Sequence, residues 1–329
     1  MRGGSPPEPA TALTEGAGSH DPRAARSRAD HRASGFGANH GDQIRRALQI
    51  ASQRPPHGED LVGWLYARWY ATGAAGPSPT ADGSVEYAAL PPGTFTAAHA
   101  DSDRWEDGAT VVSTGQAGAV VVRTAGGRVR ALGRGDYLCP AGLQGLAPPV
   151  GVSLRIRVRQ GCVVADGWWR TWGGDRRAST TGAVSRIYLA PDPEVVTTLV
   201  TQITTELRDV RHPWTLKVGA DARALDRPDG AVVYVPDAAL LSCLHRLAPA
   251  LRGLLRPHTP ALTAPVAPGI AWAHDPGDGQ SFGEHRCSLI ADVHRAAITP
   301  ATPADVAAAF RRAGLDPSAP HLRARDGAA

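Results

Sequence analysis

Lysine is almost absent from this sequence of 329 residues. Of the 35 lysine and arginine residues, all but one are arginine, and the exception is Lys217. A guanidinium keeps its proton at any working pH, whereas an ammonium on a flexible stem loses its proton readily when it is partly desolvated. Lys217 is therefore a candidate for a role that needs a neutral amine, although an ordinary surface lysine would fit the composition equally well.

Cysteine and long apolar runs are also scarce. The four cysteines, Cys139, Cys162, Cys243 and Cys287, are far apart and form no CxxC pair, which argues against a disulfide scaffold or a structural zinc site. No run of about eighteen apolar residues is present to span a membrane, and the first forty residues lack an apolar stretch typical of a signal peptide. We therefore predict reduced thiols and a cytoplasmic protein that does not enter a membrane.

Familiar catalytic signatures are missing as well. The sequence has no Walker loop, HExxH or GxSxG motif and no GxGxxG after a strand, which argues against a nucleotide-driven enzyme or a metallohydrolase. The close pairs His285 with Cys287 and Cys243 with His245 lack the spacing that brings ligands together, so we predict no metal and no cofactor. The net charge of +4 comes from arginines mixed with 31 acidic residues, which suits an anionic peptide or a phosphate and does not indicate nucleic acid.

The patterns that are present predict an α+β fold. Residues 1–40 contain almost nothing apolar and are expected to be a disordered tail. Helical spacing follows at 42–51 and 61–69, and a β-rich section runs from about 110 to 164 with a hairpin turn at 125–127. Alternation in 154–159 places Arg155, Arg157 and Arg159 on one strand face, which is either solvated or a rail for an acidic peptide. We expect an amino-terminal region of residues 41–165, with peptide binding as a candidate role.

Residues 166–329 alternate short strands with amphipathic helices and are expected to form a second α+β domain. Strands are predicted at 185–189, 214–218 and 231–235, and helices at about 192–207, 237–255, from 282 onward and 303–313. Ser281 and Glu284 have the spacing of a capping box, and Thr302 can cap the last helix. The cluster Trp168, Trp169 and Trp172 is more typical of a core than of a binding surface.

Arginines accompany Lys217 on the neighbouring elements. Arg186 lies on the strand before it, Arg223 and Arg227 lead into the strand after it, and Arg286 lies near a helix start. Guanidinium groups bind phosphate bidentately, and a helix N-terminus adds N–H donors. We therefore predict a phosphate site, whose members are Arg186, Arg223, Arg227, Arg286 and Ser281.

Several of these segments resemble the HopA-type effector family over roughly residues 61–322. They are Ser-Arg-Ile-Tyr-Leu, Trp-Thr-Leu-Lys-Val, Arg-Pro-Asp-Gly-Ala-Val-Val-Tyr-Val and Ser-Phe-Gly-Glu-His-Arg. The family is named for a type III secretion effector of plant pathogens and also occurs in actinobacterial gene clusters for class V lanthipeptides and thioamitides. In those clusters a member looks like a lyase that removes phosphate from phosphoserine or phosphothreonine in a precursor peptide. The products are dehydroalanine and dehydrobutyrine, and a separate kinase-like protein supplies the phosphate.

A more distant likeness to phosphothreonine lyases implies roles for individual residues. In those enzymes a strand lysine abstracts the α proton, a histidine about thirty residues earlier protonates the leaving phosphate, and arginines hold it. Lys217 matches the base, Arg227 and Arg286 match phosphate arginines, and Tyr188 stands where the histidine is expected. Nearby arginines would lower the pKa of Tyr188 toward a useful range, or would stabilise the phosphate well enough without an acid. The substitutes for the acid are His212 and His285.

The resemblance thus implies a phosphothreonine-lyase-like α+β domain that acts without a metal on a phosphorylated precursor peptide. A kinase-like partner that is held in one complex with the lyase and the peptide would raise the effective concentration of the phosphorylated peptide. The main alternative is a non-catalytic scaffold or leader-peptide-binding subunit of a kinase–lyase complex. A lyase acting on phosphothreonine in a host cell would in addition require a secretion route.

Overall fold

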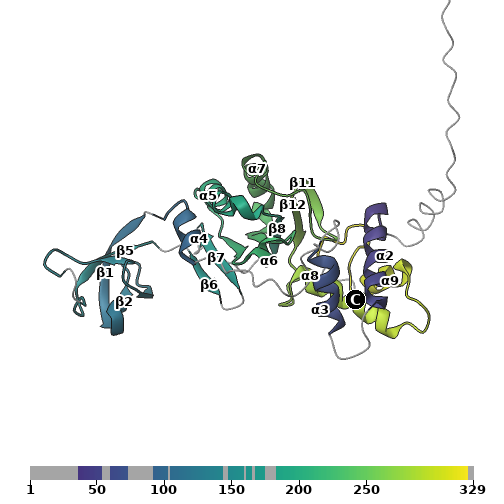
Figure 1. Ribbon diagram of the computed structural model, residues 1–329, viewed down its shortest axis with the longest axis horizontal. Helices are drawn as coiled ribbons and strands as arrows, with labels where there is room; N and C mark the ends of the chain where they lie inside the picture. Colours follow the sequence, from purple (N-terminus) through teal and green to yellow (C-terminus); the bar gives the residue numbers. More distant parts are fainter. Residues whose placement is uncertain are drawn as a thin grey trace, which may run out of the picture.

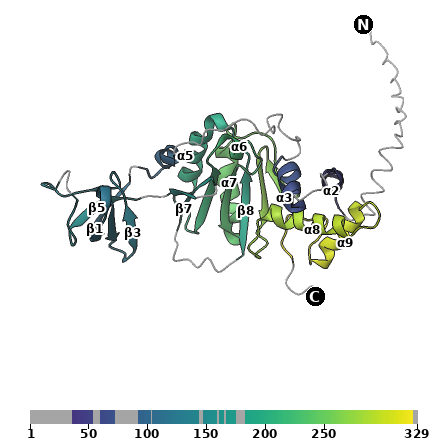
Figure 2. The ribbon, with the colours of Figure 1, turned by 60° about the horizontal axis from the view of Figure 1, so that its bottom comes forward.

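The computed structural model describes residues 36–53, 60–72, 92–102, 104–143, 147–158, 161–164, 167–174 and 183–324. These residues form an α+β fold with two antiparallel sheets, one of five strands and one of seven (Figures 1 and 2), which confirms the predicted fold class. The expected tail lies outside the described residues except for 36–40, where helix α2 (Ala38–Ser52) already begins. No helix within the described ranges is long and apolar enough to cross a membrane.

The larger sheet has the strand order β11-β12-β8-β10-β9-β7-β6. Helix α5 lies between β8 and β9 in the chain, and β10 then fills the place between these two strands in the sheet. The three predicted strands are confirmed as β8, β9 and β10. The strands are β6 (Gly161–Val164), β7 (Trp168–Gly173), β8 (Val184–Leu189), β9 (Trp214–Gly219), β10 (Ala231–Pro236), β11 (Ala264–Ala267) and β12 (Ile270–His274).

Two helices, α5 (Val196–Glu206) and α7 (Leu240–Ala250), cover one face of this sheet and enclose an apolar core. A 3-10 turn precedes each helix: η4 (Pro193–Val195) precedes α5, and η5 (Asp237–Ala239) precedes α7. Leu216, Val233 and Ile187 lie in register on β9, β10 and β8 and share one buried cluster with apolar residues of both helices. Helix α7 ends earlier than the predicted residue 255, because Gly253 takes the left-handed conformation, with φ of 82°.

Helices from both ends of the chain cover part of the opposite face. They are α2, α3 (Leu61–Leu65), the π-helix η1 (Tyr66–Tyr70), α8 (Phe282–Ala296) and α9 (Pro303–Arg312). Their buried cluster includes Tyr188 and Val232 from the sheet. The boundary predicted at residue 165 remains a prediction, but the packing groups α2, α3 and η1 with the carboxyl-terminal helices rather than with the five-stranded sheet.

The smaller sheet has its own core and lies at the other end of the molecule from α2 and α9 (Figure 1). Helix α4 (Pro92–Ala98), which precedes it, packs on α5, and a 3-10 turn η3 (Gln116–Gly118) follows β1. The predicted hairpin is confirmed as β2 and β3. Arg155 is exposed and Arg157 half-buried, opposite to buried Leu154 and Ile156, as the alternation predicts, while Arg159 lies outside the described residues. The strands are β1 (Trp105–Thr114), β2 (Val120–Arg123), β3 (Val129–Leu132), β4 (Tyr137–Leu138) and β5 (Ser153–Arg157).

Candidate functional site

The face of the seven-stranded sheet opposite the α5 and α7 core carries a row of polar residues. Arg170, Lys217, Val232 and Tyr188 are register partners on β7, β9, β10 and β8. Side chains of paired residues project to the same face of a sheet, and the alternate residues of β9, such as Leu216, are in the core. Lys217 and Tyr188 therefore project to the same side, with Cα atoms two strands and roughly 10 Å apart.

Lys217 is half-buried beside an aromatic ring that it shares with Arg227. Its Nζ atom lies 4.0 Å from the ring centroid of Trp168, a cation–π contact. The guanidinium carbon of Arg227 lies 5.5 Å from the same centroid. Trp168 is the register partner of Gly219, two residues beyond Lys217 on β9. The Trp168 ring thus brings the single lysine and one of the predicted phosphate arginines together.

Arg227 is oriented by an acidic partner and a tyrosine. Its Nε and Nη2 atoms donate to the carboxylate oxygens of Asp229 at 2.8 and 2.7 Å, and Nη2 also donates to the Tyr66 hydroxyl at 2.8 Å. Burial lowers the pKa of this guanidinium, but Asp229 and Tyr66 outweigh burial, so its pKa is raised and its charge is permanent. No described residue accepts a hydrogen bond from Nη1, so this nitrogen retains donors for an anionic ligand.

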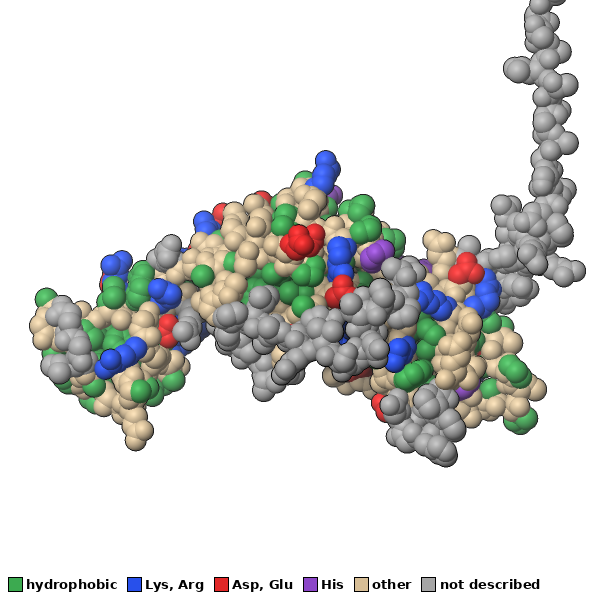
Figure 3. All heavy atoms as spheres, in the orientation of Figure 1, with side chains coloured by type: hydrophobic (Ala, Val, Ile, Leu, Met, Phe, Trp, Pro, Cys, Tyr) green, Lys and Arg blue, Asp and Glu red, His purple; other side chains and the backbone are tan. Residues whose placement is uncertain are grey.

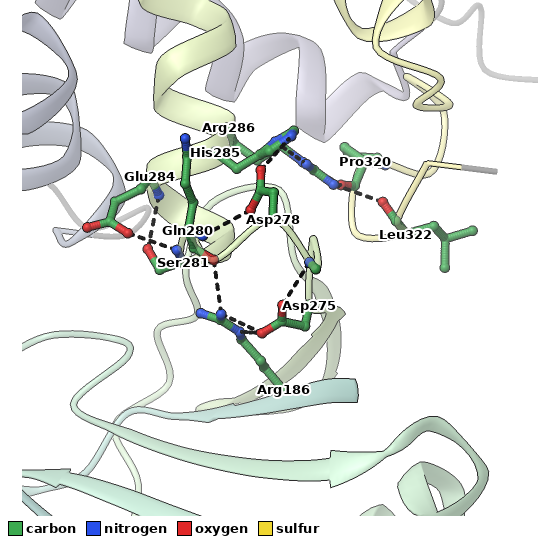
Figure 4. A network of polar contacts seen from close by, with 11 residues as sticks. Arg186, Asp275, Asp278, Gln280, Ser281, Glu284, His285, Arg286, Pro320 and Leu322 are labelled. Atoms are coloured by element: carbon green, nitrogen blue, oxygen red, sulfur yellow. Dashed lines mark hydrogen bonds and ion pairs between the residues drawn. The ribbon is translucent and has the colours of Figure 1, made fainter. Parts of the chain in front are cut away.

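Arg186 lies two residues along β8 from Tyr188. Its Nε atom donates to Asp275 at 2.7 Å, Nη2 donates to the Gln280 carbonyl at 3.2 Å, and its guanidinium lies 5.3 Å from the Tyr234 ring. Figure 4 shows the side chain rising from the sheet toward the segment that precedes α8. Burial lowers its pKa, and Tyr188, Tyr234 and Asp275 more than compensate. Arg186 therefore supplies a second fixed positive charge on the site's face of the sheet.

Tyr188 is 3% exposed, and its buried hydroxyl interacts with the hydroxyl of Tyr70. Both rings pack against Phe282 with centroids 6.3 Å apart. Burial raises the pKa of Tyr188 more strongly than Arg186 lowers it. The prediction that arginines bring this pKa down to a useful range is therefore wrong, because the opposing effect of burial is larger. The geometry favours a neutral hydroxyl that donates a hydrogen bond over one that releases its proton.

Arg286 lies near the Tyr188 and Tyr70 side of the site, 4.6 Å from the Phe282 ring, but its donors are used by other groups. The residue is 1% exposed, and its Nε and Nη2 atoms donate to the Pro320 carbonyl at 3.0 and 2.9 Å. Nη2 also donates to the Leu322 carbonyl at 2.8 Å, and Nη1 lies 2.7 Å from Nδ1 of His285. Figure 4 shows Arg286 reaching from the first turns of α8 to Pro320 and Leu322, while Arg186 lies beneath on the sheet. Burial lowers the pKa of Arg286 to about 10. The geometry does not support its predicted phosphate role, because its donors hold the carboxyl-terminal segment.

Two other predicted phosphate ligands are placed apart from Lys217. The hydroxyl of Ser281 accepts a hydrogen bond from the Glu284 amide at 3.2 Å, while the Glu284 carboxylate accepts from the Ser281 amide at 2.8 Å. This capping box at the start of α8 was predicted and is confirmed. Arg223 is exposed in the last turn of the short helix α6 (Ala222–Leu225). Neither side chain is part of the Lys217 and Arg227 cluster.

The alternative acids are not placed beside the reacting groups either. His212 is exposed and precedes Lys217 by five residues, or roughly 16 Å along an extended chain. His285 lies against Arg286, and its Nε2 atom is 3.7 Å from Asp278. Burial and the Arg286 charge lower the pKa of His285 against the opposing effect of Asp278. His285 is therefore neutral near pH 7 and lies in the network that holds the carboxyl-terminal segment.

The structure adds residues that the sequence analysis missed, namely Trp168, Arg170, Asp229 and Tyr66. Alternation along β7 could have identified the first two, because Trp169 and Thr171 are buried and Trp168, Arg170 and Trp172 face the other way. The expectation of a tryptophan core therefore holds for Trp169 alone. No local pattern identifies Tyr66, which is separated from Arg227 by 161 positions.

Potential metal ligands, free thiols and charged side chains among the described residues also bear on the chemistry available to the protein. Within the ranges that the structure describes, no group of three or more His, Cys, Asp or Glu side chains could hold a metal ion. Cys139, Cys243 and Cys287 are unpaired thiols, as predicted. On the face shown in Figure 3, Lys and Arg side chains are scattered and interrupted by acidic ones.

Comparison with known proteins places the chain in a family. It is similar to an effector protein from Pseudomonas syringae pv. tomato strain DC3000, with a TM-score of 0.51 and 17% identity over 89% of this chain and 100% of that chain. A second structure, an effector protein from Pseudomonas syringae pv. syringae strain 61, has a TM-score of 0.48 and 17% identity over 87% of this chain and 99% of that chain. At such identities the likeness concerns the fold alone. No curated protein matches. The model of the HopA1 effector protein family matches residues 155–322, more than half of the sequence, and the chain therefore belongs to this family.

Proposed function

We propose that this protein is a lyase that eliminates phosphate from phosphoserine or phosphothreonine in a peptide, leaving dehydroalanine or dehydrobutyrine. The observation that carries the proposal is the position of the only lysine. Its Nζ atom lies 4.0 Å from the Trp168 ring, against which the Arg227 guanidinium also packs. A β-elimination requires a base at the α carbon and positive charge at the leaving phosphate, and these two residues supply both.

In the proposed reaction, the neutral Nζ of Lys217 takes the α proton and becomes an ammonium. The electron pair of the Cα–H bond forms the Cα=Cβ double bond, and the Cβ–O bond breaks with its electrons leaving on the phosphate. Arg227 binds the phosphate through Nη1, and Arg170, which faces Lys217 from β7, adds a second guanidinium. A monoanionic ester then leaves as hydrogen phosphate, whereas a dianionic ester takes one proton from water.

Stabilisation by fixed charge takes the place of a strong acid in this proposal. The pKa of Tyr188 is raised by burial, so its hydroxyl contributes a hydrogen bond to the leaving group rather than a proton. Arg186, held by Asp275, places a further fixed charge near Tyr188. Preorganised positive charge is often the largest single catalytic contribution, and it acts without reorganisation during the reaction.

The family resemblance extends the proposal to the biological substrate. We infer that the substrate is a lanthipeptide or thioamitide precursor, phosphorylated by a separate kinase-like protein and processed in the cytoplasm. A complex of kinase, lyase and leader peptide would deliver each phosphorylated residue at high effective concentration. The proposed lyase uses no metal and no cofactor.

The proposal is tested by incubating the full-length protein with a synthetic phosphothreonine peptide and recording mass spectra. We expect loss of phosphoric acid, and no change in the matched peptide with unphosphorylated threonine. An intact phosphopeptide, with leader and kinase both present, would instead support a non-catalytic scaffold. One observation favours that second function: none of Tyr188, His212 and His285 is placed as a strong acid.

A further inference from the structure

Arg227, the phosphate-binding arginine of the proposed lyase, is held by Tyr66, which precedes it by 161 positions. The Tyr66 hydroxyl accepts a hydrogen bond from Nη2 of Arg227 at 2.8 Å and donates to Oδ2 of Asp229 at 3.3 Å. The tyrosine ring lies 5.1 Å from the Arg227 guanidinium. Burial, reinforced by Asp229, raises the pKa of Tyr66, so the hydroxyl stays protonated and can both accept and donate. The three side chains form a closed ring of hydrogen bonds.

The ion pair between Arg227 and Asp229 cannot fix the guanidinium by itself. Both residues lie on the short turn between α6 and β10, so their mutual contacts leave them able to move together. Tyr66 belongs to the layer of helices that covers the sheet, and its hydrogen bonds tie this turn to that layer. Asp229 is 7% exposed, which makes the tie a buried one, where a satisfied polar network rigidifies its surroundings.

Tyr66 opens the only π-helical segment among the described residues. The amide of Ala71 donates to the carbonyl of Tyr66 at 2.8 Å, which is the i to i+5 bond of a π-turn. Tyr66 and Tyr70 stack with ring centroids 5.2 Å apart and an interplanar angle of 29°. Such turns occur frequently at functional sites. Here the turn supports the tyrosine that contacts Arg227 with a second buried aromatic ring.

Gly283 of α8 leaves room for both rings. A Cβ atom at this position would lie 2.5 Å from Cε1 of Tyr70 and 2.7 Å from Cε2 of Tyr66, far closer than side-chain contacts allow. Any other residue at position 283 would displace the tyrosines. The segment Ser-Phe-Gly-Glu-His-Arg therefore has a structural role. Ser281 caps α8, Gly283 leaves space for the two tyrosine rings of the π-helix, and Arg286 binds the carboxyl-terminal segment.

We propose that Tyr66 is a positioning residue for phosphate recognition, which acts through Arg227 and depends on Gly283 for its place. The amino-terminal helix thereby completes the site of the carboxyl-terminal sheet. This inference rests on the proposed binding of a phosphorylated peptide at Arg227, but not on the elimination step itself.

The test compares Tyr66→Phe with Tyr137→Phe in the full-length protein. Both substitutions remove one hydroxyl, and that of Tyr137 donates to the Gly118 carbonyl at 2.7 Å in the five-stranded sheet. Affinity for a phosphothreonine peptide and for its unphosphorylated counterpart is measured by calorimetry. We expect Tyr66→Phe to weaken phosphopeptide binding about tenfold, as for a lost hydrogen bond to a charged group, and to leave the unphosphorylated peptide unaffected. Unchanged phosphopeptide affinity in Tyr66→Phe would overturn the inference.

A second pair of variants tests the role of Gly283. Gly283→Ala is expected to lose at least as much phosphopeptide affinity as Tyr66→Phe. Gly63→Ala is the control, because a Cβ there would meet only Asp60 at 3.5 Å. A wild-type protein that binds the phosphate without eliminating it would contradict the lyase proposal and leave this inference standing. A Tyr66→Phe variant that matches the wild type in both elimination rate and phosphopeptide affinity would contradict the inference alone. Absence of any phosphate-dependent binding would overturn both.

Discussion

Arg223 and Arg227 are four positions apart in the sequence but have different environments in the fold. Arg227 is oriented by Asp229 and Tyr66 next to Lys217, whereas Arg223 is exposed on α6. A phosphate needs a guanidinium that is held in place, because bidentate geometry contributes as much as charge. Position in the sequence does not distinguish the two residues, but their surroundings do.

We predict that Arg227→Lys lowers kcat/KM for phosphothreonine elimination by about 10- to 100-fold, since a lysine keeps the charge but not the fork of donors. Arg223→Lys serves as the matched control and should change kcat/KM less than twofold, roughly the effect of an exposed charge. Steady-state kinetics with one phosphopeptide measure both. Equal losses in the two variants would remove Arg227 from its assigned role.

Among single residues, local sequence patterns indicate which side chains have unusual chemistry, but not which donors are already used by other parts of the fold. Lys217 stands out by composition. Arg186 on β8 and Arg227 on the turn before β10 do lie on the same side of the fold as this lysine. Arg286 has the same local signals but donates to the carbonyls of Pro320 and Leu322, which lie over thirty positions away. Such engagement depends on tertiary contacts that no local pattern records.

At the scale of secondary-structure elements, the start of α8 tests whether Ser281 is a cap or a phosphate ligand. Ser281→Ala removes the acceptor for the Glu284 amide, so the free energy of unfolding should fall by about 1 kcal/mol. Ser281→Thr should restore it, because threonine caps almost as well. Urea unfolding measures the stability. Phosphopeptide affinity is expected to be the same in all three proteins, and a selective loss of affinity in Ser281→Ala would reinstate the phosphate role.

His99, in the loop after α4, should make the stability of the folded protein depend on pH. His99 is buried there, its Nδ1 accepts a hydrogen bond from the Asp101 amide, and burial lowers its pKa to about 4 although Asp101 opposes the shift. Between pH 6.5 and 4 the unfolded chain binds a proton at this histidine that the folded protein does not. Stability contributed by neutral His99 is therefore complete above pH 6.5 and falls as the pH drops toward 4, by about 3 kcal/mol at most.

His99→Asn keeps an acceptor for the Asp101 amide and removes the titration. Unfolding free energies measured from pH 4 to 7 should therefore vary less steeply with pH in this variant than in the wild type. His245→Asn provides a comparison, because that histidine is exposed on α7. An identical pH dependence in wild type and His99→Asn would show that His99 does not titrate differently on unfolding.

Element boundaries followed local signals where these are strong. The predicted capping residues Ser281 and Thr302 both mark real helix starts, and the alternating strands are present. The π-turn at Tyr66 was not predicted, because residues 61–69 have ordinary helical spacing and the wider turn depends on packing against α8. Local propensity thus predicted the helix but not its geometry at the site.

On the scale of the whole molecule, the chain has separate cores for its two sheets. The five-stranded sheet buries Leu154, Ile156 and Val122 in its own cluster, apart from the clusters on either face of the seven-stranded sheet. Its outward face carries exposed Arg123 and Arg155, and Arg155 forms an ion pair with Asp107 at 3.5 Å. The proposed chemistry lies on the other sheet.

We predict that Ile156→Ala destabilises the five-stranded sheet by about 2–5 kcal/mol through the cavity that it leaves. Hydrogen exchange measured by mass spectrometry should show faster exchange in β1–β5 and unchanged protection in β8–β10. Elimination from a short phosphothreonine peptide should be unaffected. Loss of protection throughout both sheets would show that the two cores unfold as one unit.

The sheet order and the partnership of the chain's two ends could not be predicted from sequence. Both depend on contacts between segments far apart, such as Tyr66 with Arg227 and α2 with α9. Hydrophobic periodicity shows that each helix has a buried face and does not show which partner covers it. The proposed site consequently includes an amino-terminal residue that a division of the chain at residue 165 would have excluded.

The most direct test of the account is elimination by Lys217→Arg. Arginine keeps the positive charge and the apolar stem beside Trp168 but cannot accept the α proton. We expect loss of phosphoric acid from a phosphothreonine peptide to slow by about 10²–10⁴-fold, the range for removal of a general base. Phosphopeptide affinity should stay within a few-fold of wild type. Elimination by Lys217→Arg at the wild-type rate would contradict the account, because the only lysine would then have no part in the chemistry.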